Sequence, residues 1–292
     1  MKVLNYGSLN YDHVYQNEHF VQEKETISSL SYRRGFGGKG LNQSIALAKA
    51  NVQIYHAGKV GNDGQDFIDY LKSYNVNTDY LIKDNSVATG HAIIEVVNGQ
   101  NRIILHGGAN TSITEKDIDE TLNHFEANDI LLIQNEISNI PYLLKKAHEK
   151  KMKIYFNTAP MDSKVFTYPL EYVDTFIANE VEGAGLSKCN STDVKDIIDS
   201  LKKTYPTKEI ILTCGEKGSY YIYKDKVIFQ DIFPCEVKDT IAAGDTFTGF
   251  YLASIINGDS VEKALETAAK ASSITCSKEG AAVSIPSIKD LK

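Results

Sequence analysis

The sequence predicts an α/β protein in which helices cover both faces of a central, mostly parallel sheet. Strand-like and helix-like segments alternate from residue 52 to residue 213, which is typical of repeated strand–helix–strand units. The strand-like segments are apolar at nearly every position, as in parallel strands that are buried on both faces. Residues 11–36 are instead polar and rich in Tyr, Glu and Ser, which indicates a small sheet outside the main core.

The elements of the main body follow from the spacing of apolar residues along the chain. A first short strand is expected at 2–8, ending at Gly7 and Ser8. Further strands are expected at 52–57, 129–134, 153–157, 175–178 and 209–213. Helical spacing predicts helices at 41–50, 64–74, 115–125, 139–151, 180–186, 192–204, 242–257 and 260–276. Residues 216–235 are expected to add antiparallel strands.

Two other parts of the chain predict strands with a different pattern. Polar and apolar residues alternate from Thr26 to Tyr32, as they do in a strand with one buried face. Residues 88–97 and 101–106 are expected to form two strands, because Asn98-Gly99 between them is a typical two-residue hairpin turn.

The composition excludes several classes of protein. The 292 residues are 42% hydrophobic and 24% charged with a net charge of −7, which fits a folded globular chain with a sizeable core. Only three arginines occur, whereas nucleic-acid binders carry a clustered basic surface. The four cysteines form no C-x-x-C pair, which favours reduced thiols over a zinc site or disulfides. With no signal peptide and no apolar stretch near ~18 residues, we expect a cytoplasmic protein without a membrane partner.

The segment 239–247 has the properties of an anion-binding helix start. Residues 242–244 are all small and precede an apolar helical run, so their side chains leave the approach open. Free N–H groups and the positive end of the helix dipole attract an anion at such a position. Asp245 lies beside that anion and can accept a proton from an attacking hydroxyl group. Asp239 and Asp245 could also be ordinary acids at a helix N-terminus, which leaves the small residues between them unexplained.

The glycine-rich segment from Gly35 to Asn42 is a second candidate site. It contains G-x-G-x-x-G, but a dinucleotide site is excluded, because the motif follows the polar segment 11–36 and does not directly follow the first core strand, and no acid lies about 20 residues further on. G-x-x-x-x-G-K-[ST] is absent from the sequence. Two alternatives stay open. The glycines let a ligand approach Lys39 and Asn42, which suit hydroxyl recognition, or the segment is a tight turn with Lys39 in solvent.

Polar residues follow the predicted strands at the edge where their carboxyl ends meet. Each residue by itself is typical of a helix cap or a turn. Together they lie on one rim of a parallel sheet, which is where such sheets bind ligands. The residues concerned are Asn10, Asp12, Glu136, Asn179, Glu182 and the segment 213–218.

Two segments resemble the signatures of the PfkB family of carbohydrate kinases. One runs from Gly37 to Gln43 and the other, which is highly specific, is 239–247. Matches at 7–12, 108–110, 179–182 and 280–286 extend the resemblance over essentially the whole chain. The resemblance implies a single α/β domain over residues 1–292, with a β-sheet lid formed by about 12–36 and 88–106.

The resemblance also implies roles for individual residues. Asp245 is implied as the catalytic base, beside an anion hole formed by Ala242, Ala243 and Gly244. Sugar hydroxyls would be held by Asn10, Asp12, Gly38, Lys39, Asn42, Glu136 and Asp245. ATP would be bound by Asn179, Thr213, Gly215, Glu216, Gly218 and Gly244, with Glu182 positioning Mg²⁺ through water. A monovalent cation, expected to be K⁺, would be bound by Asp239, Ile241, Thr275, Lys278, Gly280 and Ser284.

The implied reaction is transfer of the γ-phosphoryl group of ATP to the primary hydroxyl of a sugar. The resemblance is greatest to family members that act on D-ribose and pair as homodimers through the lid. Kinases for fructose, deoxyribose or nucleosides stay open as alternatives, because five residues depart from the usual pattern: Arg33, Arg34, Leu41, His91 and Asn135. A catalytically silent sugar- or nucleotide-binding regulator is a further alternative, which the intact segment 239–247 disfavours.

Overall fold

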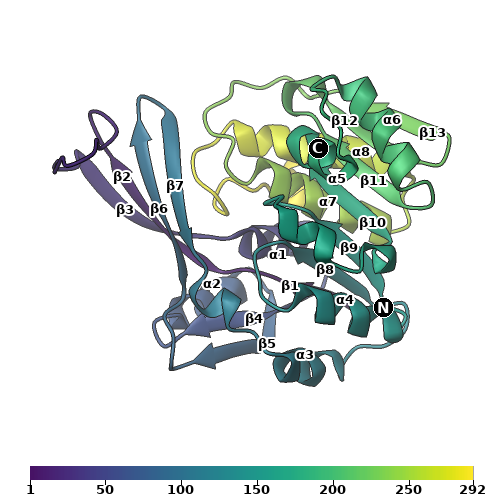
Figure 1. Cartoon of the computed structure of the whole chain (residues 1–292), viewed down its shortest axis with the longest axis horizontal. Helices are drawn as coiled ribbons and strands as arrows, with labels where there is room; N and C mark the ends of the chain where they lie inside the picture. The colour runs from purple at the N-terminus through teal and green to yellow at the C-terminus, as the bar shows by residue number, and fades with distance from the viewer. Residues whose placement is uncertain (292) are drawn as a thin grey trace.

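The computed structural model describes residues 1–291 and contains two separate sheets (Figure 1). The main sheet has nine strands, in the order β13-β12-β11-β10-β9-β8-β1-β4-β5. These strands are β1 (Val3–Tyr6), β4 (Ile54–Gly61), β5 (Asn77–Asp84), β8 (Ile130–Gln134), β9 (Lys153–Asn157), β10 (Thr175–Asn179), β11 (Glu209–Thr213), β12 (Ser219–Tyr223) and β13 (Lys226–Gln230). The small sheet has the order β3-β2-β6-β7, with β2 (Asn10–Gln16), β3 (Ser31–Gly37), β6 (Gly90–Val97) and β7 (Gln100–His106).

The strands of the main sheet are parallel except for β12 and β13, as the sequence predicts. Successive side chains of a strand point to opposite faces, and here both faces are buried. In β1, Val3 belongs to the core on one face and Leu4 to the core on the other. In β8, Leu132 and Leu131 are divided in the same way. This double burial explains why the strands are apolar at nearly every position.

Helices cover both faces of the main sheet, which confirms the predicted fold class. One face is covered by α1 (Lys39–Lys49), α2 (Gln65–Ser73), α7 (Ala243–Ile256) and α8 (Val261–Cys276). The other is covered by α3 (Glu115–Leu122), α4 (Ile140–Glu149), α5 (Glu180–Ser187) and α6 (Val194–Thr204). Short 3₁₀ helices are η1 (Gly108–Thr111), η2 (Ser163–Thr167), η3 (Leu170–Tyr172), η4 (Gly215–Lys217) and η5 (Ile288–Leu291). Within residues 1–291, no helix has both the length and the apolar character needed to span a bilayer.

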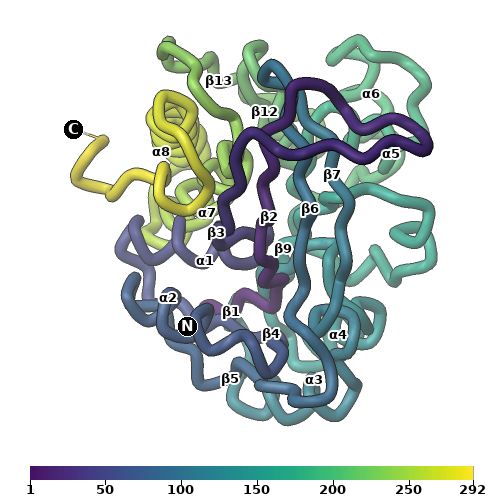
Figure 2. Tube along the Cα trace, turned by 90° about the vertical axis from the view of Figure 1, so that its left-hand side faces the viewer, coloured from purple at the N-terminus to yellow at the C-terminus, as the bar shows by residue number. Residues whose placement is uncertain are grey.

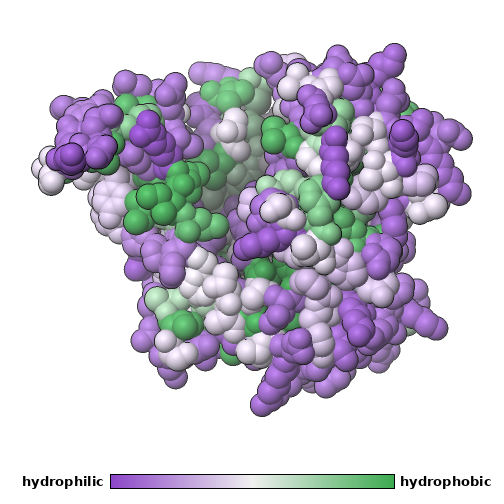
Figure 3. All heavy atoms as spheres, in the orientation of Figure 1, coloured by the Kyte–Doolittle hydropathy of each residue, from purple (hydrophilic) through white to green (hydrophobic). Residues whose placement is uncertain are grey.

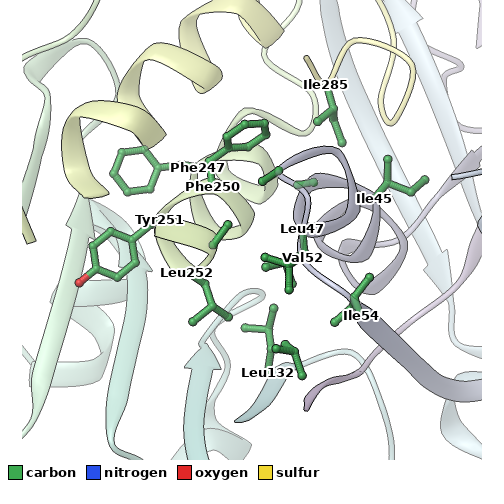
Figure 4. Packing of buried hydrophobic residues seen from close by; sticks show 14 of the residues in the cluster. Ile45, Leu47, Val52, Ile54, Leu132, Phe247, Phe250, Tyr251, Leu252 and Ile285 are labelled. Carbon is green, nitrogen blue, oxygen red and sulfur yellow. The ribbon is translucent and has the colours of Figure 1, made fainter. Parts of the chain in front are cut away.

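The core beneath α1 and α7 positions the later site. Figure 4 shows this core, to which Ile45 and Leu47 of α1 and Phe250 and Leu252 of α7 belong. Full burial of such a side chain contributes about 1.5–3 kcal/mol to folding. Gly249 allows the two helices to approach closely, because a Cβ there would lie 2.4 Å from the Cβ of Ala46. Close packing of α7 on α1 therefore fixes the relative position of their N-terminal turns.

The small sheet projects from one side of the body and faces it across a gap (Figures 1 and 2). Strand β2 pairs in parallel with β6, and the outer strands β3 and β7 pair antiparallel with them. The hairpin predicted at Asn98-Gly99 is confirmed. Both residues have positive φ, 48° and 78°, as a two-residue turn of this type requires.

The structure corrects the sequence prediction at two places. The alternation that begins at Thr26 does not make a strand before Ser31, because residues 26–30 lie in an exposed connection at the end of the small sheet. Strand β5 was not predicted, because its sequence NTDYLIKD is largely polar. It forms at the edge of the main sheet, where only β4 pairs with it.

Candidate active site

A cleft of about 470 Å³ lies between the small sheet and the carboxyl ends of the main strands. Figure 3 shows a hollow at this position, with hydrophobic side chains along its small-sheet wall. Strand β1 pairs in parallel with β4 on one side and with β8 on the other, so later strands are added on opposite sides of β1. A crevice at such a switch point is where open α/β sheets bind ligands. Predicted site residues on its wall are Asn10, Asp12, Gly38, Lys39, Asn42, Glu136, Asn179, Glu182, Thr213, Ile241, Ala242, Gly244 and Asp245.

The start of α7 presents free backbone N–H groups to this cleft. Ala242 precedes the helix in the left-handed region, with φ 62°. Such strain in a residue other than glycine costs about 1–3 kcal/mol and is typical of functional sites. The N–H groups of Gly244 and Asp245 have no acceptor within residues 1–291, whereas Ala243 N–H donates to Thr240 O at 3.2 Å. The structure therefore brings Ala242 and Gly244 to the cleft and engages the amide of Ala243 in a turn.

Asp245 is buried beside these amides, in the first turn of α7, with 7% of its surface exposed. Its Oδ2 accepts a hydrogen bond from Asn42 Nδ2 at 2.9 Å, and its Oδ1 accepts one from Gln43 Nε2 at 2.9 Å. Both donors come from α1, which the approach at Gly249 holds against α7. The two motifs that are 200 residues apart in the sequence thus form one unit around a carboxylate.

Further charged groups gather at the end of the cleft where α1 begins, close enough to Asp245 for their charges to interact. Glu136 accepts hydrogen bonds from the Ser8 hydroxyl and from the backbone N–H of Lys39, the latter at 3.1 Å. Burial, together with the neighbouring charge of Glu136, raises the pKa of Asp12 to about 6. Burial lowers the pKa of Lys39, but the carboxylates of Asp245 and Glu136 outweigh it, so that pKa is raised. Lys39 therefore keeps its charge at the edge of the cleft rather than serving as a solvated turn residue.

Asn10 and Gly38 are held at this end by the turn between β1 and β2. Asn110 donates from Nδ2 to Asn10 Oδ1 at 2.9 Å and bonds both backbone groups of Leu9 at 3.0 Å. Gly38 has φ 98°, and a Cβ there would lie 2.8 Å from the backbone oxygen of Ser8. Only glycine fits this conformation and spacing. The segment is therefore a tight turn from β3 into α1, and Gly38, Lys39 and Asn42 of this turn line the cleft.

The residues predicted to hold ATP are only partly brought together. Asn179 caps α5: its Oδ1 accepts from Glu182 N–H at 2.9 Å, and Glu182 Oε2 accepts from Asn179 N–H at 2.9 Å. Both residues line the cleft, as does Thr213 at the end of β11. Three other predicted residues follow β11 without forming the cleft wall: Gly215, Glu216 and Gly218.

The two loops predicted to bind a monovalent cation are joined by one carboxylate. Asp239 Oδ1 accepts from Ile241 N–H, and Oδ2 accepts from Gly280 N–H, both at 3.0 Å. Thr275 O accepts from Lys278 N–H at 3.1 Å. Carbonyl oxygens without a donor among residues 1–291 belong to Ile241, Lys278, Gly280 and Ser284. Across the same residues, no three His, Cys, Asp or Glu side chains gather in a metal-binding cluster.

Sequence reasoning predicted the small sheet as a lid but missed the apolar residues with which β6 and β7 line the cleft. Ala92 and Ile94 of β6 face the cleft beside their cross-strand partners Leu105 and Ile103 of β7. Asn157 and Thr248 on the floor were also missed. The alternation of residues in β6 and β7 shows which side chains share a face. Knowing that this face lines the cleft also requires the pairing of β6 with β2. Gln43 was noted only as part of a motif, and its bond to Asp245 could not be inferred.

The five departures from the family pattern are not among the residues that line the cleft. Leu41 lies in the core, and His91 lies on the outer face of the small sheet, beside His106. Arg34 stacks on Tyr11 at 4.4 Å from its ring centre, also on the outer face. Asn135 bonds Pro160 O and the Tyr168 hydroxyl, and Arg33 is exposed in β3.

Comparison with known proteins defines the class to which the fold and cleft belong. Residues 1–288 match the pfkB family carbohydrate kinase, and the chain belongs to this family of phosphotransferases with an alcohol acceptor. Ribokinase from Staphylococcus aureus (strain COL) is 32% identical over 99% of this chain and 98% of the relative. The structure of Arabidopsis thaliana ribokinase complexed with ribose and ATP aligns with a TM-score of 0.89 at 30% identity, over 99% of this chain and 97% of that chain. A deoxyribokinase from Salmonella typhimurium is 28% identical over 97% of this chain and 95% of the relative.

Proposed function

We propose that this protein is a kinase that transfers the γ-phosphoryl group of ATP to the primary hydroxyl of D-ribose, giving D-ribose 5-phosphate. The observation that carries the proposal is the Asp245 carboxylate, buried beside the unpaired N–H groups of Gly244 and Asp245 in the cleft. The relatives named ribokinase, which match over nearly their whole length, support ribose as the acceptor. We place the protein in the cytoplasm, because ATP is available there and reducing conditions keep thiols such as its four free cysteines reduced.

Asp245 accepts the proton of the attacking hydroxyl, and the N–H groups at the start of α7 stabilise the charge on the transferring group. The hydroxyl oxygen forms the new O–P bond, the bond to the ADP oxygen breaks, and ADP leaves with the electron pair. Phosphoryl transfer depends mainly on positioning and on charge neutralisation, which such a helix start supplies without rearrangement. Ala92, Ile94, Ile103 and Leu105 give the small sheet an apolar inner wall that excludes water when it acts as a lid.

The sugar binds at the charged end of the cleft. Carboxylates and amide oxygens there accept hydrogen bonds from hydroxyl groups, and Lys39 donates to them. Asn42 contributes an acceptor, because its Oδ1 is buried and has no partner within residues 1–291. The proposed sugar ligands are Asn10, Asp12, Gly38, Lys39, Asn42, Glu136 and Asp245.

Phosphorylation of an acceptor panel tests the proposed function. Coupled ADP release is measured with ribose, deoxyribose, fructose and a nucleoside, each at the same Mg-ATP concentration. We expect the highest kcat/KM with ribose. Turnover of another acceptor without ribose would contradict the substrate, and binding of ATP and sugar without any turnover would support a regulator.

The proposed contacts to ATP on the cleft wall are Asn179, Thr213 and Gly244. The nucleotide would extend past the wall to Gly215, Glu216 and Gly218, which follow β11. Mg²⁺ accompanies ATP and neutralises phosphate charge. Glu182 fits an indirect, water-mediated role, because its two oxygens already accept from Asn179 while oxygen lone pairs stay available. Burial raises the pKa of Glu182.

Removing K⁺ is expected to lower kcat about tenfold at fixed Mg-ATP. The proposed site joins the Asp239 carboxylate to backbone carbonyls, including those of Ile241 and Gly280, directly before α7. A cation there neutralises the carboxylate and fixes the loop that ends at the anion site. Initial rates are measured in K⁺ and in tetramethylammonium buffers of equal ionic strength. Equal rates in the two buffers would contradict this site, and Asp239→Ala is expected to remove the K⁺ dependence.

The KM for ribose is expected to rise about fourfold between pH 7.5 and pH 5.5. The ionised carboxylate of Asp12 accepts stronger hydrogen bonds from hydroxyl groups than the protonated form does, and its raised pKa of about 6 means that this strength is lost as the pH falls through 6. KM is measured across this range at saturating Mg-ATP. Asp12→Asn is the control, with a KM that is high and independent of pH. A flat KM in the unsubstituted protein would contradict the assignment.

The small sheet is the proposed surface for a homodimer. Its outer face exposes Ile93, Ile104 and Tyr32, which are 42%, 69% and 52% exposed. The pairing register places all three on the face opposite Asp12 and the cleft. Burial of such a face by a second copy removes apolar area from water. Sedimentation velocity measures the assembly, and a monomer at micromolar concentration would contradict it.

A further inference from the structure

Gln43 contacts the proposed base but not the cleft. Its side chain is fully buried, and it does not line the cleft wall, whereas its neighbour Asn42 does. Its Nε2 nevertheless donates to Asp245 Oδ1 at 2.9 Å. Any effect of Gln43 on the reaction must therefore pass through Asp245 rather than through substrate.

A chain of buried amides fixes which end of Gln43 faces Asp245. Asn5 Nδ2 donates to Gly40 O, which can only accept, at 2.8 Å. Asn5 Oδ1 therefore faces Gln134 and accepts from its Nε2 at 2.9 Å. The second hydrogen of Gln134 Nε2 is donated to Gln43 Oε1 at 2.7 Å, so Gln43 Nε2 must point to Asp245. The polarity of the whole chain is set by one backbone carbonyl.

This polarity stabilises the ionised form of the Asp245 carboxylate. Both oxygens of Asp245 meet N–H donors, from Asn42 and Gln43. The second lone pair of each oxygen stays open to the proton of the acceptor hydroxyl, and turning either amide would take an N–H donor away from the charged carboxylate. Gln43 cannot turn without losing its bond from Gln134, since two N–H groups would then face each other. Hydrogen bonds to a charged acceptor of this kind contribute about 1.5–3 kcal/mol.

The amide chain is costly to the fold, which argues against a purely structural purpose. Asn5, Gln43 and Gln134 are each 0% exposed. Gln134 Oε1 is buried without a partner within residues 1–291, and such an atom costs about 1–3 kcal/mol. A Cβ on Gly7, which directly follows β1, would lie 2.4 Å from this oxygen. Only a glycine at position 7 therefore leaves room for the oxygen of Gln134. An apolar residue at position 134 would serve the core with no unpaired oxygen.

We propose that Gln43, oriented by Gln134 and Asn5, is a positioning residue that holds Asp245 ionised and directed at the acceptor hydroxyl. The proposal rests on the proposed function, because it assigns Asp245 as the base. Substrate contacts stay intact when Gln43 is changed, so the effect falls on kcat rather than on KM. The same bond favours the charged carboxylate, so its loss also moves the acid limb of the pH profile of kcat.

The test measures kcat and KM against pH for Gln43→Met, which keeps the side-chain length and removes both polar atoms. Loss of one charge-assisted hydrogen bond, about 1.4–2.8 kcal/mol, is expected to lower kcat about 10- to 100-fold at neutral pH. The acid limb is expected to move up by about one pH unit, with both KM values within about threefold. Gln134→Met is expected to cause smaller changes in the same direction, and the double variant little more than Gln43→Met alone.

Two further variants separate positioning from stability. Gln43→Glu keeps the shape and the bond from Gln134 but places a second carboxylate against Asp245, and it is expected to move the acid limb further than Gln43→Met. Thr175→Val is the matched control. It removes the hydrogen bond of 3.1 Å that the buried Thr175 hydroxyl donates to Glu209, at the start of β10 and away from the cleft. It is expected to lower Tm without moving the acid limb.

An unchanged acid limb in a folded Gln43→Met, or a raised KM with unchanged kcat, would overturn the proposal. Absence of turnover in the unsubstituted protein would instead refute the proposed function.

Discussion

Replacing Asp245 by Asn is expected to lower kcat about 10³-fold while the KM values for sugar and ATP change by less than about fivefold. The variant keeps the shape of the side chain but can no longer accept the proton of the attacking hydroxyl, a contribution of about 10²–10⁴ in rate. Substrate contacts from the rest of the cleft wall are retained. The anion site and bound reactants leave some residual catalysis. Coupled ADP release at saturating substrates measures kcat.

The same substitution has a structural cost that must be measured separately. Asn42 and Gln43 both donate to Asp245, so an amide at position 245 places one N–H group against another. Thermal unfolding therefore accompanies the kinetics. Asp259→Asn is the control, because Asp259 follows the same helix and accepts only from the Ser254 hydroxyl among the side-chain donors. A folded Asp245→Asn that keeps more than about a tenth of the activity would refute a base at this position.

Replacing Gly244 by Val is expected to lower kcat/KM for ATP by at least about 10²-fold with little change in Tm. The N–H of Gly244 faces the proposed position of the transferring phosphoryl group, and a Cβ there meets no protein atom within 4 Å. The added methyl groups therefore occupy space that is open in the protein but needed by the anion. Loss of one such backbone donor alone costs about 10²–10³ in rate.

Variation of size at position 244 distinguishes blockage of the site from damage to the helix. Gly244→Ala adds one methyl group and is expected to lower kcat/KM less than Gly244→Val, whereas helix propensity favours Ala over Gly by about 1 kcal/mol. Activity and Tm should therefore change in opposite directions for Ala. A fall in Tm that parallels the fall in activity across the two variants would contradict an anion site at this helix start.

The parts of the molecule that sequence predicts best are those governed by local spacing. Every residue of β8 and every residue of β9 after Lys153 is buried, as their apolar runs predict, and the small residues before Asp245 predict an open helix start. Strand β5 was missed because an edge strand satisfies only one side of its backbone and tolerates polar residues. Local pattern decides the element in each of these cases.

Contacts between distant segments could not be predicted in the same way. The bond from Gln43 to Asp245 depends on how closely α1 and α7 approach, and that distance is set by Gly249 against Ala46. The inner wall formed by Ile94 and Ile103 depends on the pairing of β2 with β6, which joins segments about 80 residues apart. Sequence spacing shows which face such residues share but not what lies opposite that face.

Strand β7 has a consequence for handling the protein in solution. All seven of its residues are exposed, it pairs on one side only, and Ile103, Ile104 and Leu105 are consecutive. An exposed apolar edge of this kind is a template for disordered self-association unless something covers it. Under the proposed function, sugar and nucleotide would cover the inner face of the small sheet, and the proposed second copy would cover its outer face. Colloidal stability should therefore be lowest in dilute, substrate-free samples, and storage with both substrates should delay precipitation.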